Sequence, residues 1–291
     1  MMTLTINAEK FHIPASWNEL TPDQLLRVGQ LSTTQRSPAD FKLKVLLKVT
    51  GLTVMPRHEV MINDEPHYYL QSHSRKIHLV SLAALNEVCE AIDFMFEVDR
   101  TATPPQWMLS SRLTRNIIGP LKTQRGLWYG PADYLANLVT EEYIRAEVSL
   151  YRYYETHRVN YLDVLVATLW RPVAASPTTT GVREPFDDGA VASRAVIASV
   201  LPAEAKNAVL MFYEGCRKAL NAKFRSASGG KGKADKDIFM QFMRMVNGLA
   251  NNDVTKHEQV RRAPLMDTLI TIDELARQQQ ELEQKMKKHR K

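Results

Sequence analysis

Cysteine and long apolar runs are both scarce in this sequence. Only Cys89 and Cys216 occur among its 291 residues, too few for a disulfide framework and typical of a reducing compartment. No stretch approaches the roughly 18 consecutive apolar residues that identify a membrane-spanning helix. Residues 1–14 show neither the basic nor the apolar region of a secretory signal. We therefore expect a cytoplasmic protein without a membrane partner.

Motifs for catalysis or metal binding are also lacking. The sequence contains no Gly-x-Ser-x-Gly elbow and no Gly-x4-Gly-Lys-Ser/Thr phosphate loop. "SGGKGKADK", within residues 226–236, has the wrong spacing for such a loop. His67, His73 and His78 lack the tight spacing or the cysteine partners that a zinc site needs. Both cysteines fall on apolar helix faces, where a thiol packs as a small hydrophobe. We expect no enzyme, no metal and no cofactor.

The positive net charge comes from one segment. The formal charge of the chain is +6, and residues 285–291, "KMKKHRK", contain five Lys/Arg and no acid. The rest of the chain is therefore nearly neutral. This distribution argues against a basic nucleic-acid-binding domain and indicates a basic tail that would attract an acidic surface.

Hydrophobic periodicity predicts a mainly α-helical chain. Thr21 is placed as an N-cap, Pro22 as the first helical residue and Gln24 as the partner in a capping box. Apolar residues recur at helical spacing in several further segments. These helices are expected at 39–50, 81–97, 132–157, 160–170, 189–200, 202–224, 236–249 and from 265 onward. Short strands are expected within 52–80, where β-branched and aromatic runs are broken by proline and Asn-Asp.

The expected fold is a helical bundle with a small irregular or β excursion in the N-terminal half and an extended C-terminal helix. The expected regions are 1–99, helical with short strands; 100–131, an extended excursion or hairpin; 132–225, a central helical bundle; 226–236, a flexible linker; and 237–291, helices with the basic tail.

An apolar helix over 160–170 runs into Trp170, Arg171 and Pro172. Arg171 at the helix C-terminus can hydrogen-bond the last free carbonyls and meet the negative end of the dipole. Pro172 stops the helix, and Trp170 supplies a large rigid anchor. The position of Arg171 therefore indicates a structural role.

A polar loop is expected over 171–188, and it contains a second arginine, Arg183, followed closely by Phe186. Pairing of Arg183 with Glu184 or Asp187 would pin that loop. We interpret Arg171, Pro172, Arg183 and Phe186 together as a structural motif, not a catalytic one.

Tyrosines recur along the segment 132–157. Tyr143, Tyr151 and Tyr154 are interleaved with arginines, a pattern that base-stacking proteins use. A tyrosine stripe on a helix is more often core or helix-packing surface, and we favour that interpretation.

The helix expected from residue 265 carries an apolar seam of its own. Leu275, Leu282 and Met286 follow a and d heptad positions, with Gln279 between them. Two heptads are too short to be stable alone, so the stripe needs the body of the protein or a partner. We favour a partner; the alternative is a frayed terminus without a role.

The segment 162–172, "LDVLVATLWRP", resembles a Leu-x-Ala-x-Leu-Tyr-Arg-Pro motif of the tail-assembly (tape-measure) chaperone proteins of tailed phages and prophages. Trp170 stands where tyrosine is more usual. The flanking segments "GPADYLANLVTEEYIRAEVSLYRYYE" and "LPAEAKNAVLMFYEGCRKAL" also resemble that family, so the resemblance covers about residues 130–225.

The resemblance implies a protein that binds the tape-measure protein, or another tail protein, in the cytoplasm of a bacterial host during tail morphogenesis. The alternatives are a structural virion component, such as a baseplate or tail-completion protein, and a nucleic-acid-binding module. Self-association into a homo-oligomer stays open. The residues expected to contact the partner are Tyr143, Tyr151, Trp170, Leu275, Leu282 and Met286.

Overall fold

The computed structural model describes residues 2–6, 8–31, 38–99, 106–178, 181–224 and 238–289. The flexible linker expected at 226–236 lies outside the described residues. The chain divides into two compact units. The first comprises Met1–Ile118 with Pro202–Gly215, and the second comprises Gly119–Leu201 with Cys216–Lys291. Helix α7 (Ala203–Lys223) therefore contributes to both units.

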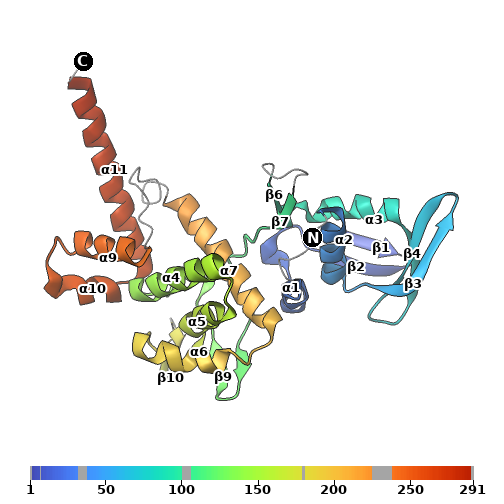
Figure 1. Ribbon diagram of the computed structural model, residues 1–291, viewed down its shortest axis with the longest axis horizontal. Coiled ribbons are helices and arrows are strands. Elements are labelled where there is room, and N and C mark those ends of the chain that lie inside the picture. Colours follow the sequence, from blue (N-terminus) through green and yellow to red (C-terminus); the bar gives the residue numbers. More distant parts are fainter. Residues whose placement is uncertain are drawn as a thin grey trace. The chain divides into compact units, whose positions relative to one another are not determined.

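The first unit combines helices with three antiparallel sheets (Figure 1). Its strands are β1 (Met2–Ile6), β2 (Glu9–Ile13), β3 (Thr53–Ile62), β4 (Glu65–Gln71), β5 (Ile77–Ser81), β6 (Phe96–Asp99) and β7 (Gln106–Leu109). They pair as β1-β2, β3-β4-β5 and β6-β7. Its remaining helices are η1 (Trp17–Glu19), α1 (Pro22–Gly29), α2 (Pro38–Thr50), α3 (Leu82–Cys89) and the 3-10 helix η2 (Glu90–Met95).

Local signals account for several of these elements. Thr21 and Gln24 form the predicted capping box at the start of α1, so that prediction is confirmed. Asn63 and Asp64 adopt positive φ angles of 51° and 62° between β3 and β4. Two consecutive residues with positive φ are typical of a type I′ turn, whose twist matches that of the two strands of a tight hairpin. The strands predicted within 52–80 are confirmed as β3, β4 and β5.

The hydrophobic core of the first unit forms between sheet and helices. Phe11, Leu52, Leu70 and Leu85 make one buried cluster that joins β2, β4 and α3. Helix α3 contacts both β4 and β5, and α2 contacts β2. One face of the three-stranded sheet is thereby covered.

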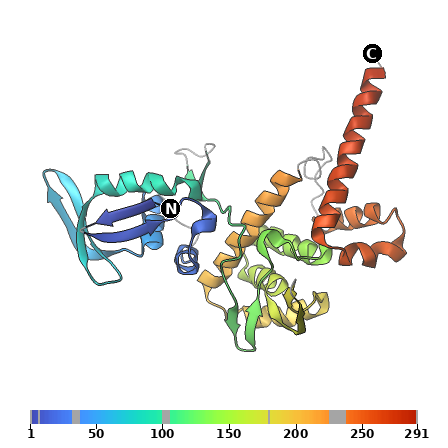
Figure 2. The ribbon, with the colours of Figure 1, turned by 180° about the vertical axis from the view of Figure 1, so that it is seen from behind.

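The second unit holds one sheet and most of the helical residues (Figure 2). Its strands β8 (Leu121–Thr123), β9 (Gly126–Tyr129), β10 (Arg171–Thr178) and β11 (Gly181–Arg183) pair in the order β11-β10-β9-β8. Its helices, besides the second part of α7, are η3 (Asp133–Leu135), α4 (Thr140–Thr156), α5 (Val159–Leu169), η4 (Asp188–Ala190), α6 (Val191–Ala198), α9 (Ile238–Leu249), η5 (Val254–Lys256), α10 (His257–Arg262) and α11 (Leu265–His289).

Helices α4, α5 and α6 pack in sequence, α4 on α5 and α5 on α6 (Figures 1 and 2). Leu165, Val166 and Trp170 are fully buried in this unit. Cys216 on α7 is also buried, as expected from its position on an apolar helix face, and Leu220 on the same helix is buried too. The end of α5 and the start of β10 are thus buried within the second unit.

The expected fold class, a mainly helical bundle, is wrong. The described residues form four antiparallel sheets alongside the helices, a mixed α/β architecture in which each unit contains a sheet. The expected helix 81–97 ends at Cys89 and passes through η2 into β6, and the expected loop 171–188 contains β10 and β11. Strand β10 pairs with β9, with Arg171 opposite Tyr129. A strand of this kind is stabilised by a partner strand far away in the sequence. Its own residues therefore give little indication that it will be a strand.

None of the described helices is both long enough and apolar enough to cross a membrane.

Candidate functional site

A buried carboxylate stands at the start of α4 in the second unit. Glu142 lies in the first turn of the helix, and its side chain is 1% exposed. Thr140, the first residue of α4, also fixes the start of the helix. Its hydroxyl hydrogen-bonds the Thr268 hydroxyl at 2.7 Å and the Ala263 carbonyl at 3.1 Å. The carboxylate is therefore held at a defined place between α4 and the sheet.

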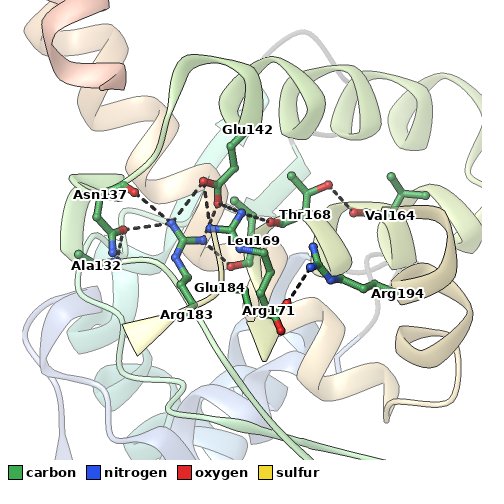
Figure 3. A network of polar contacts seen from close by, with 10 residues as sticks. All are labelled: Ala132, Asn137, Glu142, Val164, Thr168, Leu169, Arg171, Arg183, Glu184 and Arg194. Atoms are coloured by element: carbon green, nitrogen blue, oxygen red, sulfur yellow. Dashed lines mark hydrogen bonds and ion pairs between the residues drawn. The ribbon is translucent and has the colours of Figure 1, made fainter. Parts of the chain in front are cut away.

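Two buried arginines converge on Glu142 (Figure 3). Arg183 Nη1 lies 2.5 Å from Glu142 Oε1, and Arg171 Nη1 lies 3.3 Å from the same oxygen. Each arginine also approaches Oε2 at 3.4 Å. Both arginine side chains are 3% exposed. We call these three residues the Arg–Glu–Arg cluster.

The cluster also ends helix α5. Arg183 Nη1 donates to the Leu169 carbonyl at 2.8 Å, and Arg171 Nη1 approaches the Thr168 carbonyl at 3.5 Å. Arg183 Nη2 donates to the Asn137 side-chain oxygen at 3.2 Å. Positive charge at a helix C-terminus is stabilising because the last carbonyls are unpaired there. The cluster therefore ties α4, α5, β10 and β11 together.

Burial shapes the ionisation of the cluster. Loss of water raises the pKa of Glu142, while Arg183 and Arg171 oppose that rise. Burial lowers the pKa of Arg171 to about 10, although Glu142 counteracts the effect. The guanidinium of Arg171 also lies 5.5 Å from the centre of the Phe186 ring. Such a ring attracts a cation over its face.

A second ion pair adjoins the cluster. Arg194 Nη2 lies 2.9 Å from Glu184 Oε2, and Arg194 acts on the pKa of Arg171 as a nearby like charge. Three arginines, Arg171, Arg183 and Arg194, thus pair with the two carboxylates of Glu142 and Glu184. When all five side chains are ionised, their net charge is one positive charge.

A pocket of about 290 Å³ lies beside the cluster. Its lining residues are Asn137, Val139, Glu141, Glu142, Arg171, Ala174, Ser176, Arg183, Glu184, Pro185, Phe186 and Arg262. All belong to the second unit. The residues that line the pocket thus include charged groups and the apolar side chains of Phe186, Pro185, Val139 and Ala174.

The sequence-based pairing of Arg183 was wrong. Arg183 contacts Glu142, and Glu184 pairs with Arg194 instead. The sequence did not identify Glu142 as the partner of Arg171 and Arg183, because it is separated from Arg171 by 29 residues and from Arg183 by 41.

The tyrosine and tryptophan residues expected to contact a partner lie in different environments. Trp170 is 0% exposed and Tyr143 is 9% exposed, with the Tyr143 ring in an edge contact with Phe242 of α9. Tyr151 is 36% exposed. Of these three side chains, Tyr151 is the one that a partner can reach in this conformation. Pro172 begins β10 opposite Trp128 of β9.

The apolar seam of α11 changes environment along its length. Its a and d positions are Leu265, Thr268, Ile272, Leu275, Gln279, Leu282 and Met286. Leu265 is 1% exposed and Thr268 is 6% exposed where α11 contacts α4. Leu275, Leu282 and Met286 are 50%, 60% and 59% exposed. The N-terminal part of the seam is therefore buried in the core of the protein, and the C-terminal part lies at the surface.

Among the residues that the structure describes, no group of three or more His, Cys, Asp or Glu is arranged to hold a metal ion. Cys89 and Cys216 are buried, and burial raises their pKa to about 11 and about 12. A thiol with such a pKa is a poor nucleophile at neutral pH.

In comparisons with protein-family models, with curated proteins and with solved structures, no match to this chain was found.

Proposed function

We propose that the protein is a non-catalytic assembly protein that binds a long helical partner through α11. The observation that supports the proposal is the continuation of one heptad seam from a buried to an exposed environment. Leu265 packs against the protein itself, whereas Leu282, at the same seam, is 60% exposed. A helix that keeps an apolar seam beyond its own core is typical of helix-in-groove and coiled-coil recognition.

The energy available from this seam is modest. Complete burial of a leucine or methionine side chain contributes about 1.5–3 kcal/mol. Because Leu275, Leu282 and Met286 are already partly buried, covering them would contribute about half of that each, roughly 2–5 kcal/mol in all. A binding free energy in this range is compatible with reversible binding during assembly and is too small for a permanent complex.

The partner that we propose is a tape-measure protein or another tail protein of a phage or prophage, met in the cytoplasm of the bacterial host. The resemblance of residues 162–172 to the tail-assembly chaperone motif supports this choice. A tape-measure chain is long and amphipathic, and would offer apolar stripes to cover. The basic side chains of Lys285 and Lys287 are exposed beside Met286 and would favour an acidic stretch next to the stripe.

A matched pair of variants tests the proposal. Leu282 lies on the seam, and Ile270 lies at an f position on the opposite helical face, 45% exposed. Both side chains are surface residues, so Leu282→Gln and Ile270→Gln should each change stability by about 0.5 kcal/mol or less. Co-expression with a tape-measure protein encoded by the same genome, followed by copurification, compares the binding of the two variants. We expect Leu282→Gln to reduce recovery of the partner and Ile270→Gln to retain it.

The outcomes separate the alternatives. Equal recovery by both variants would refute binding through the seam. Mass spectrometry of mature particles separates a chaperone, which should be absent from them, from a structural virion component, which should be present. Binding to DNA that weakens steeply with added salt would favour a nucleic-acid-binding module instead.

A further inference from the structure

The C-terminal half of α11 is exposed on all of its sides. Figure 1 shows α11 as one continuous helix. Every residue from Arg277 to Lys287 is exposed, and the apolar seam continues through this stretch with Leu282 and Met286. A single helix of this length is marginal in water without packing on an apolar face. The described part of the chain supplies no such packing here, so the seam needs a cover from outside.

The exposed part of the seam is complementary to its own reverse. Leu275 and Met286 are the two ends of the segment 275–286, and Gln279 and Leu282 lie equally far from its middle. A second copy related by a two-fold axis through that middle would run antiparallel. It would place Leu275 beside the partner's Met286, and Leu282 beside the partner's Gln279. Each d position thus meets an a position, and the same contacts occur twice, as in any two-fold interface.

The charges along α11 favour the antiparallel direction. Residues 272–283 contain four acidic residues and one arginine, which gives a net charge of −3, whereas residues 285–291 contain five Lys/Arg and no acid. An antiparallel pair lays each basic end along the acidic stretch of the other copy, with Lys287 level with the partner's Glu274. A parallel pair would lay the two basic ends side by side, where like charges repel.

The composition of the seam limits the strength of such a pair. Leu275, Leu282 and Met286 are 50%, 60% and 59% exposed, so six partly exposed apolar side chains would be covered by two copies. Gln279 places a polar side chain at an a position, which lowers the stability of a coiled coil and fixes its register. The pair would therefore be specific and reversible.

We propose that in the free protein the exposed seam of α11 is covered by α11 of a second copy, as a two-fold antiparallel pair. The proposed tape-measure partner uses the same seam, so it would displace one copy from the other when it binds. Only this displacement rests on the proposed function. The pairing itself is carried by the symmetry of the seam and by the separation of charge along the helix.

Sedimentation equilibrium of the full-length protein alone tests the pairing. We expect a monomer–dimer equilibrium with a dissociation constant between about 1 μM and about 1 mM. Leu282→Gln should raise that constant at least about tenfold. Gln279→Leu should lower it at least about tenfold, because two covered polar side chains become apolar. Gln284→Leu makes the same change at an exposed f position on the opposite helical face, and should leave the constant within about twofold of the wild type.

Salt and one charge reversal test the direction of the pair. Sodium chloride screens charges, so an increase from about 0.05 M to about 0.5 M should weaken an antiparallel pair about threefold or more, and would strengthen a parallel one. Lys287→Glu places an acid level with the partner's Glu274 and should also weaken the dimer, whereas it would relieve repulsion in a parallel pair. Lys122→Glu makes the same charge change on β8, where Lys122 is exposed, and should have little effect.

The pairing is overturned if the Gln279→Leu protein stays monomeric at about 1 mM, or if Gln279→Leu and Gln284→Leu associate equally. It is also overturned if added salt or Lys287→Glu strengthens the dimer. Such results would leave the copurification comparison of Leu282→Gln with Ile270→Gln standing. A dimer with the expected responses, together with equal recovery of the tape-measure protein by those two variants, would keep the pairing and refute the partner proposal.

Discussion

Replacement of Glu142 by glutamine removes one charge from the centre of the Arg–Glu–Arg cluster and preserves the shape of the side chain. Arg171 and Arg183 would then remain 3% exposed without their counter-charge. The new amide group would also turn two donor hydrogens toward guanidinium donors. Breaking a buried ion pair by removing one partner typically costs about 3–5 kcal/mol, since the remaining charge stays desolvated. We expect Glu142→Gln to lower the free energy of unfolding by about that amount.

The size of the effect makes it measurable. A whole domain is typically stable by about 5–15 kcal/mol, so the variant would lose a large share of it. For a unit of this size each kcal/mol lowers the melting temperature by about 2–4 °C, which gives a fall of about 6–20 °C. Trp128 and Trp170 are buried in the second unit. With Trp17 and Trp107 replaced by phenylalanine, urea titration followed by tryptophan fluorescence would report on the second unit alone.

Glu147 on the same helix provides the control. Its side chain is 5% exposed and pairs with Arg217 Nε at 2.9 Å, but the Arg217 side chain is 40% exposed. Arg217 can turn to water when the carboxylate is lost, so Glu147→Gln should cost only about 1–2 kcal/mol. If Glu142→Gln cost less than about 1 kcal/mol, or no more than Glu147→Gln, the claim that Glu142 neutralises two desolvated arginines would be refuted.

Two further predictions concern glycines and thiols. A Cβ at Gly215 would lie 2.2 Å from the Leu113 carbonyl oxygen, so Gly215→Ala should lower the melting temperature. A Cβ at Gly248 would meet nothing within 4 Å. Because Gly248 lies inside a helix, Gly248→Ala should raise the free energy of unfolding by about 0.5–1 kcal/mol. Burial raises the pKa of Cys89 to about 11 and of Cys216 to about 12. The folded protein then binds more protons than the unfolded chain above about pH 9, so the free energy of unfolding should fall with rising pH by up to about 1.4 kcal/mol per pH unit for each thiol. Urea titrations between pH 8 and pH 11 would show this slope, and it should become shallower in Cys216→Ala.

Elements with a complete local signal were predictable from the sequence. The capping box of Thr21 and Gln24 lies within four residues, and it is present in α1. The spacing of Cys216 and Leu220 follows one helix face, and both are buried. In these cases the residues that specify the structure are neighbours on the same element, so the sequence contains all the necessary information.

Elements that depend on distant partners were not predictable in the same way. Strand β10 pairs with β9 through Arg171 and Tyr129, which are far apart in the chain. Strands β1 (Met2–Ile6) and β2 (Glu9–Ile13) form although no strand was expected there. Short strands gain their stability from the neighbour that completes the hydrogen bonds, and that neighbour is set by the tertiary fold.

In the candidate site, too, contacts between residues close in the sequence were predictable and contacts between distant residues were not. The position of Arg171 at the end of an apolar helix correctly indicated contact with the last carbonyls, because that contact spans three residues. Glu142 is separated from Arg171 by 29 residues and from Arg183 by 41. Its role depends on how α4 packs against α5 and the sheet, and no local pattern encodes that packing. Nearby Glu184 offered a shorter and equally plausible pairing, which the fold does not use.

The start of α4 links the cluster to the proposed binding helix within the second unit. Glu142 and Thr140 lie in the same helical turn, and Thr140 contacts Thr268 in the first turn of α11 and Ala263 just before that helix. Loss of Glu142 would therefore loosen the base of α11 as well as the sheet. Binding lost in Glu142→Gln should track the folded fraction and return at lower temperature, whereas binding lost in Leu282→Gln should not, since Leu282 contributes at the surface and not to the core.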